Sequence, residues 1–142
     1  MSTIFIASDH AGLELKDAIK IHLEQKGLNV EDLGPSKESG SVDYPDYAKK
    51  VSKAVLEKKA LGILICGTGI GMSISANKVR GIRAALVSES YSAEMARRHN
   101  NANILCIGSR VTGLGLALNV VDTWLNTEYE AGRHQNRLDI IE

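Results

Sequence analysis

Residues 62–71, with the sequence GILICGTGIG, decide the fold of this chain. The first half, Gly62–Cys66, is a short apolar run that predicts a buried strand. The second half alternates glycine with other residues and leads into a stretch that predicts a short helix ending near Val79. A strand that passes through a glycine loop into a helix is the repeating step of an α/β fold.

The same step recurs on both sides of this segment. Short runs rich in β-branched residues predict further strands at Thr3–Ser8, Asn29–Leu33, Arg83–Val87 and Asn103–Ile107. Apolar residues at helical spacing predict further helices at Gly12–Lys26, from Pro45 through Val55, at Tyr91–Asn100 and at roughly Leu114–Leu125. Five strands separated by helices imply right-handed crossovers and a parallel sheet covered on both faces.

The chain length fits one domain, because 142 residues can bury one sizeable core but not two. The sequence therefore predicts a single α/β domain over residues 1–142, built as a three-layer sandwich around a five-stranded parallel sheet. This is the doubly wound, Rossmann-like arrangement. A polar arm, EYEAGRHQNRLDIIE, ends the chain.

Composition and charge exclude several classes of function. Seventeen basic residues balance seventeen acidic ones, so no overall field favours nucleic acid or an acidic membrane surface. The N-terminal residues MSTIFIASDH lack the pattern of a signal peptide, and no apolar run reaches membrane-spanning length. The two cysteines, Cys66 and Cys106, show no paired-motif spacing. We therefore expect a cytoplasmic protein with reduced thiols.

Ligands of such sheets bind outside the carboxyl ends of the strands, which directs attention to Asp9, His10, the Cys66 loop and Gly108–Arg110. In the loop, alternating glycines turn amide groups outward, and the following helix adds partial positive charge that stabilises an oxyanion. The loop is not a dinucleotide fingerprint, because Met72 stands where the third glycine belongs. A tight turn without a ligand explains the glycines about equally well.

The two cysteines have different settings. A thiol at a helix N-terminus carries a larger thiolate fraction at neutral pH, which favours a reactive role for Cys66. Cys106 stands inside the strand segment ILCIG and is expected to be a small buried core residue.

Other polar residues allow two interpretations each. Asp9 could bind a ligand or cap the following helix. His99 closes a helix, where a packed or capping histidine is more usual than a catalyst. Arg133 and Arg137 stand four residues apart on one side of a helix and could bind phosphate with Arg110, although solvated charge also explains the pair.

No metal site or redox cofactor is expected. Four histidines and two cysteines show no zinc-type spacing, and Asp43 and Asp46 form no calcium loop. A single Phe and a single Trp give little support for a flavin-binding electron carrier.

Seven ordered segments together resemble the type B ribose-5-phosphate isomerases of the ribose/galactose phosphate isomerase family. They are SDHAG, DYPDYA, ILICGTGIGMSISANK, GIRAALV, RRHNNAN, IGSR and EYEAGRHQNR, and the resemblance runs from Ile4 to about Asp139. It implies an enzyme that interconverts D-ribose 5-phosphate and D-ribulose 5-phosphate through an enediolate, in the non-oxidative pentose phosphate branch, without cofactor or metal. It also implies homodimers or tetramers whose sites are shared between subunits.

The resemblance assigns three catalytic residues. Cys66 is similar to the base that moves a proton between C2 and C1, Thr68 to the residue that assists proton movement between O1 and O2, and His99 to the acid that opens the furanose ring. The amides that resemble the enediolate-binding hole belong to Gly67, Thr68, Gly69, Ile70 and Gly71. The positions that match sugar contacts are Asp9, Asp43 and Asn100, and those that match phosphate contacts are His10, Arg110, Arg133 and Arg137.

Alternatives remain within and outside this family. One subgroup lacks the cysteine and carries a glutamate where this chain has Met72, which cannot accept a proton, so Cys66 must serve here. Galactose-6-phosphate isomerase subunits replace parts of the Asp-His and Cys-Gly-Thr segments, and this chain keeps both. The pentose substrate is therefore favoured over a hexose 6-phosphate of the allose or galactose type. A non-catalytic sensor of phosphorylated sugars would not need Cys66, Thr68 and His99 together.

Overall fold

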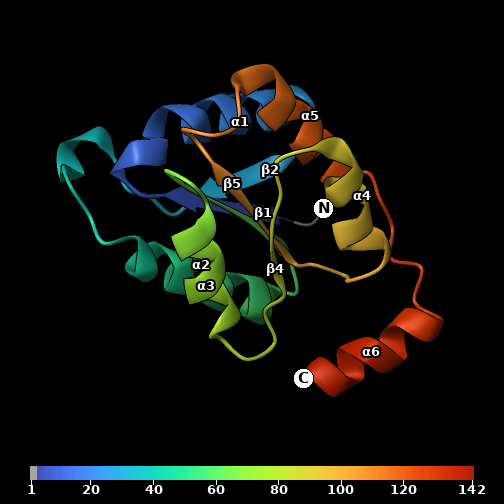
Figure 1. Ribbon diagram of the computed structural model, residues 1–142. Helices are drawn as coiled ribbons and strands as arrows, with labels where there is room; N and C mark the ends of the chain where they lie inside the picture. Colours follow the sequence, from blue (N-terminus) through green and yellow to red (C-terminus); the bar gives the residue numbers. More distant parts are fainter. Residues whose placement is uncertain (1–2) are drawn as a thin grey trace.

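A single parallel sheet forms the centre of the protein in the computed structural model, which describes residues 3–142 (Figure 1). Its order is β2-β1-β3-β5-β4. The bounds of the strands are Thr3–Ser8 for β1, Asn29–Asp32 for β2, Leu61–Cys66 for β3, Ala84–Leu86 for β4 and Ile104–Gly108 for β5. The winding direction reverses between β1 and β3, so a ligand is expected outside the carboxyl ends of these two strands.

Helices cover both faces of the sheet, which confirms the predicted three layers (Figure 1). The bounds of the helices are Leu13–Gln25 for α1, Tyr44–Lys58 for α2, Ile70–Asn77 for α3, Ser90–Arg98 for α4, Leu114–Leu125 for α5 and Arg133–Ile141 for α6, with 3₁₀ turns at His10–Gly12 and Lys37–Ser39. None of the helices within residues 3–142 combines the length and apolarity needed to cross a membrane.

The alternation of side chains along β1 shows how the sequence separates the two cores. Ile4 and Ile6 join the cluster beneath α1, α4 and α5, whereas Phe5 and Ala7 join the cluster beneath α2 and α3. Successive residues of a strand point to opposite faces, so an apolar run buries both faces at once. Met72 is fully buried in the second cluster, so its side chain lies in the core.

The observed elements differ from the predicted ones by one or two residues at several ends. The first helix starts at Leu13 rather than Gly12, because Asp9 caps a 3₁₀ turn that precedes it. The fourth strand is limited to Ala84–Leu86. Its first residue is held from outside the sheet by the side-chain amide of Asn77, which both accepts from the Ala84 N–H at 2.8 Å and donates to the Ala84 carbonyl at 2.9 Å.

The C-terminal arm folds into α6, which lies beside the end of α4 and outside the three layers (Figure 1). The Glu130 N–H donates to the Arg98 carbonyl at 3.0 Å, and an ion pair joins Arg83 to Glu142 at 2.7 Å. Arg83 immediately precedes β4, so the arm is fixed at the amino edge of the sheet.

Candidate active site

Cys66 is the last residue of β3, at the carboxyl edge of the sheet, and is 5% exposed. Its Sγ accepts a hydrogen bond from the Gly69 N–H at 3.2 Å. This backbone donor fixes the position of the sulfur at the start of the glycine loop. The hydrogen bond from Gly69 thus supports the predicted reactive role of Cys66.

Cys106 has the opposite environment. It is fully buried in the middle of β5, and burial, followed by the charge of the neighbouring Cys66, raises the pKa of its thiol. It is a small core residue, as the sequence predicted.

The loops that follow β3 and β5 are joined to each other. The Ser109 N–H donates to the Cys66 carbonyl at 2.9 Å, and the Arg110 N–H donates to the Gly67 carbonyl at 3.0 Å. Gly69 has a φ of 80°, and a Cβ there would lie 3.0 Å from the carbonyl carbon of Ile107 and 3.2 Å from the amide nitrogen of Gly108, at the end of β5. A larger residue would therefore be strained and would separate the two loops.

The amides of the glycine loop are divided between internal and free donors. The Gly69 N–H is bound to the Cys66 sulfur, and the Ile70 N–H donates to Thr68 Oγ1 at 3.2 Å. The amides of Gly67 and Thr68 donate to no acceptor among residues 3–142. These free donors, together with the N-terminus of α3, form a place where an oxyanion would be stabilised.

Asp9 and His10 follow β1 and lie next to β3. The Asp9 N–H donates to the Ile65 carbonyl at 3.0 Å, and Asp9 Oδ1 accepts from the amides of Ala11 and Gly12 at 2.9 and 3.2 Å. The capping interpretation of Asp9 is thus confirmed. His10 Nδ1 accepts from the Val42 N–H at 3.2 Å, so a neutral His10 carries its proton on Nε2.

The start of α2 brings one predicted residue, Asp43, and one residue without a predicted role, Tyr44, to this edge. Asp43, an exposed residue, occupies the N-cap position of α2. Tyr44 follows it and packs against Gly71, where a Cβ would lie 2.5 Å from Tyr44 Cε1. The one signal for Tyr44 was its place in the DYPDYA segment.

Arg110 completes the group at the carboxyl edge. It follows β5 and is exposed, with Nη1 3.2 Å from the position of a Cβ at Gly67. The structure thus gathers one set of predicted site residues at one edge of the sheet: Asp9, His10, Asp43, Cys66, Gly67, Thr68, Gly69, Ile70, Gly71 and Arg110.

The remaining predicted residues lie at the opposite, amino edge. Helix α4 begins after β4 and runs back along the sheet, and His99 caps its C-terminus by donating its N–H to the Met95 carbonyl at 2.9 Å. Shortly after it, Asn103 accepts from the Gly62 N–H at the start of β3. A strand of this length spans roughly 17 Å at about 3.3 Å per residue, so His99 does not reach Cys66 of its own chain.

Asn100, Arg133 and Arg137 belong to this second group. All three are exposed, and the Asn100 carbonyl accepts from Arg83 Nε at 3.1 Å. Both arginines project from α6, the helix that is fixed at the amino edge.

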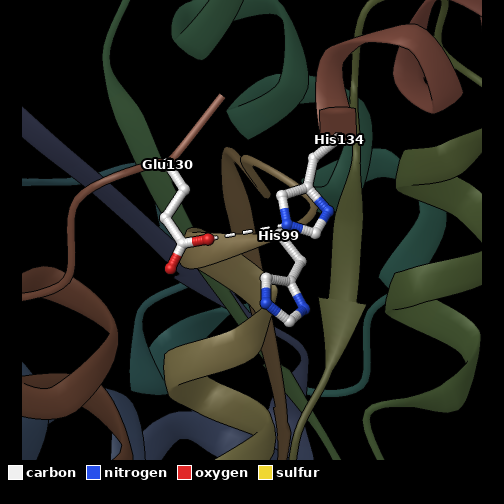
Figure 2. Close-up of side chains that lie close together, drawn as sticks. All are labelled: His99, Glu130 and His134. Carbon is white, nitrogen blue, oxygen red and sulfur yellow. Dashed lines mark ion pairs between the residues drawn. The ribbon is translucent and has the colours of Figure 1, made fainter. Parts of the chain in front are cut away.

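A cluster that spacing did not predict lies within the second group. His99 stacks on His134 with ring centroids 4.2 Å apart and planes 18° apart, and Glu130 Oε1 lies 3.6 Å from His134 Nε2 (Figure 2). The nearest ligand atoms of the three residues lie within 4.8 Å of one another, which could suit a metal ion. Imidazole lone pairs lie in the ring plane, however, so nearly parallel stacked rings do not converge on one ion.

Comparisons of the sequence with known proteins cover nearly the whole chain. The sequence model of the Ribose/Galactose Isomerase family matches residues 4–141. Ribose-5-phosphate isomerase B of Escherichia coli is 50% identical over 142 residues, which cover 99% of this chain and 95% of the relative. The probable ribose-5-phosphate isomerase B of Mycoplasma genitalium is 50% identical over 140 residues, covering 97% of this chain and 92% of the relative.

The fold of this chain also matches solved structures closely. Ribose-5-phosphate isomerase B of Clostridium thermocellum matches with a TM-score of 0.95 at 52% identity, covering 98% of this chain and 94% of that one. Ribose-5-phosphate isomerase B of Mycoplasma genitalium with bound ribulose-5-phosphate matches with a TM-score of 0.94 at 49% identity, covering 98% and 93%.

Proposed function

The chain belongs to the ribose/galactose isomerase family, and from this premise we propose that it interconverts D-ribose 5-phosphate and D-ribulose 5-phosphate. The observation that carries the proposal is the Cys66 sulfur, held by the Gly69 amide at 3.2 Å beside free amides of the same loop. A base and an oxyanion site on the same few residues are what enediolate chemistry needs. The relative with bound ribulose-5-phosphate supports the choice of sugar.

The proposed reaction moves one proton between neighbouring carbons. The Cys66 thiolate takes the proton from C2 of the open-chain aldose, and the electron pair of that bond forms the enediolate. The same thiol then returns the proton to C1, while the Thr68 hydroxyl passes a proton between O2 and O1. A positioned general base contributes roughly 10²–10⁴-fold and each oxyanion donor roughly 10²–10³-fold to such a step.

Substrate binding at the carboxyl edge follows from the charges there. The carboxylates of Asp9 and Asp43 accept hydrogen bonds from sugar hydroxyls. His10, which keeps its Nε2 proton because Nδ1 is occupied by Val42, donates to the phosphate together with Arg110.

We further propose that two copies of the chain assemble so that the amino-edge residues of one complete the site of the other. In support, His99 and Cys66 lie at opposite edges of their own sheet. Exposed apolar side chains also surround the Thr68 loop: Ile70 is 50% exposed, Leu86 42% and Val111 64%, and all three line one 220 Å³ hollow with Thr68. Such a patch on a folded chain marks an interaction surface. Both cysteines are free thiols, which is the usual state in the reducing cytoplasm. We therefore still propose a cytoplasmic location.

The test is conversion of ribose 5-phosphate in D₂O, followed by NMR. We expect ribulose 5-phosphate to form and deuterium from the solvent to enter the transferred position. Cys66→Ala should lower kcat by more than about 10²-fold, while the matched variant Cys106→Ala should keep kcat near that of the unmodified protein. Near-normal turnover by Cys66→Ala would contradict the proposed base. If kcat/KM were higher for allose 6-phosphate or galactose 6-phosphate than for ribose 5-phosphate, the proposed substrate would be that hexose phosphate instead of the pentose phosphate.

A further inference from the structure

The stack between His99 and His134 joins the end of α4 to the first turn of α6 (Figure 2). His134 is 8% exposed, so its ring is enclosed on one side while the other faces His99. The backbone hydrogen bond from Glu130 to Arg98 already fixes the path of the arm here. The contact between the two rings is therefore not needed to attach the arm, and another role can be sought for it.

We propose that His134 is a positioning residue for ring opening: its stacked imidazole fixes the plane in which His99 presents its N–H to the furanose oxygen of the substrate. The proposal rests on the proposed isomerase function and on the role of His99 as the ring-opening acid.

The orientation of His99 depends on this stack. Among residues 3–142, no hydrogen bond holds either ring nitrogen of His99, so its two side-chain torsions are limited by packing alone. A proton donor must meet its acceptor at about 2.6–3.2 Å, and a misplacement of about 1 Å can cost about 10²-fold in rate. A flat neighbour at 4.2 Å removes the ring rotations that would break this geometry while leaving both nitrogens free for the substrate.

His134 itself is not a hydrogen-bonded relay. Its Nε2 is buried and has no hydrogen-bond partner among the described residues, and Glu130 Oε1 lies 3.6 Å away, beyond hydrogen-bond distance. His134 therefore acts on His99 through ring stacking and not through proton transfer.

The electrostatics of the cluster fit this role. Burial lowers the pKa of His134, and His99, Arg133 and Arg137 lower it further against the opposing effect of Glu130. The lowered pKa favours the neutral form of His134, so no second cation lies against the face of His99.

The experiment compares His134→Ala, which removes the stack, with His134→Phe, which keeps a flat ring without nitrogen. Two reactions are measured for each. Conversion of ribose 5-phosphate starts from a closed ring. Exchange of the C1 proton of ribulose 5-phosphate with D₂O does not, because the phosphate ester on O5 prevents this ketose from closing a five-membered ring. His22→Gln is the control, because it replaces a histidine that lies outside the site, in contact with Asp122.

We expect His134→Ala to lower kcat for conversion about 10-fold while C1 exchange stays near that of the unmodified protein. His134→Phe and His22→Gln should retain both reactions. The positioning role would be overturned if His134→Ala lost conversion and exchange equally, or if its conversion were unchanged. It would also be overturned if His134→Phe were as slow as His134→Ala. Absence of any conversion by the unmodified protein would instead refute the proposed function.

A second readout needs no activity. Ring currents of His134 should displace the imidazole proton resonances of His99, and this displacement should disappear in His134→Ala and persist in His134→Phe. Identical His99 resonances in the unmodified protein and His134→Ala would show that the stack does not form in solution and would overturn the proposal.

Discussion

Gly108 and Thr68 approach each other so closely that no side chain fits between them: a Cβ at Gly108 would lie 2.6 Å from the Thr68 carbonyl carbon. The obstacle is backbone, which cannot rotate away as a side chain can. Gly108 also pairs with Cys66 across the sheet. The contact therefore fixes the loop that carries Thr68 relative to the strand that carries Cys66.

We predict that Gly108→Ala separates these two loops. Overpacking of this kind costs typically about 1–3 kcal/mol, and loss of alignment should lower kcat by at least about 10-fold. Thermal denaturation and the isomerase assay check the two effects. Gly113→Ala is the matched control, because nothing lies within 4 Å of its Cβ position and its φ is −66°. If the two variants behave alike, the close approach has no functional role.

The fold could be predicted from the sequence because each element carries a local signal. The β1 residues Ile4 and Phe5 lie in different cores, which is what a continuous apolar run implies. The strand order was not predictable, since apolar periodicity contains no information on which strands pair. The paths of the chain also explain why His99 lies far from Cys66: a helix that follows a parallel strand must return to the amino edge.

The site was predicted less completely than the fold. Cys66 could be singled out because a strand end and a helix start are visible in the sequence. Tyr44 and His134 were missed because their importance comes from tertiary contacts, with Gly71 and His99 respectively. Neither contact has a sequence spacing that a local pattern would detect.

The two thiols should differ in reactivity toward iodoacetamide. Cys66 lies at a strand end with an amide donor on its sulfur, whereas burial raises the pKa of Cys106 inside β5. Since the thiolate is the nucleophile, we expect mass spectrometry to find alkylation of the native protein at Cys66 and not at Cys106. Ribulose 5-phosphate should slow the labelling and the accompanying loss of activity. Preferential labelling of Cys106 would contradict the assignment.

Asp122 should make stability depend on pH. Partial burial acts to raise the pKa of its carboxyl, but hydrogen bonds with Lys26 and His22 outweigh that effect and the pKa is lowered overall. The two contacts measure 2.9 Å each. A carboxyl whose folded pKa lies below its unfolded value stabilises the fold above the unfolded pKa, near 3.9 for Asp, and this contribution is lost as pH falls through the folded pKa.

We therefore expect Asp122→Asn to lower Tm at pH 7, with the difference from the unmodified protein shrinking below about pH 4. Thermal denaturation of both proteins from pH 7 down to about pH 2 measures this difference. Asp17→Asn, at an exposed position, is the control and should change Tm little. An Asp122→Asn difference that grows as the pH is lowered would contradict the sign of the pKa shift.

Shared sites can be tested by mixing two inactive variants, Cys66→Ala and His99→Asn. If each site takes Cys66 from one copy and His99 from the other, a mixed pair of subunits has one site with both defects and one site with neither. Random reassociation of equal amounts then makes half of all dimers mixed, so about a quarter of the sites regain both residues and activity should rise to about a quarter of that of the unmodified protein. If instead both residues came from the same copy, every site would keep one defect and mixing would restore nothing. Reassociated samples of each variant alone provide the baseline, and recovery no greater than that baseline would exclude the proposed exchange of site residues between subunits.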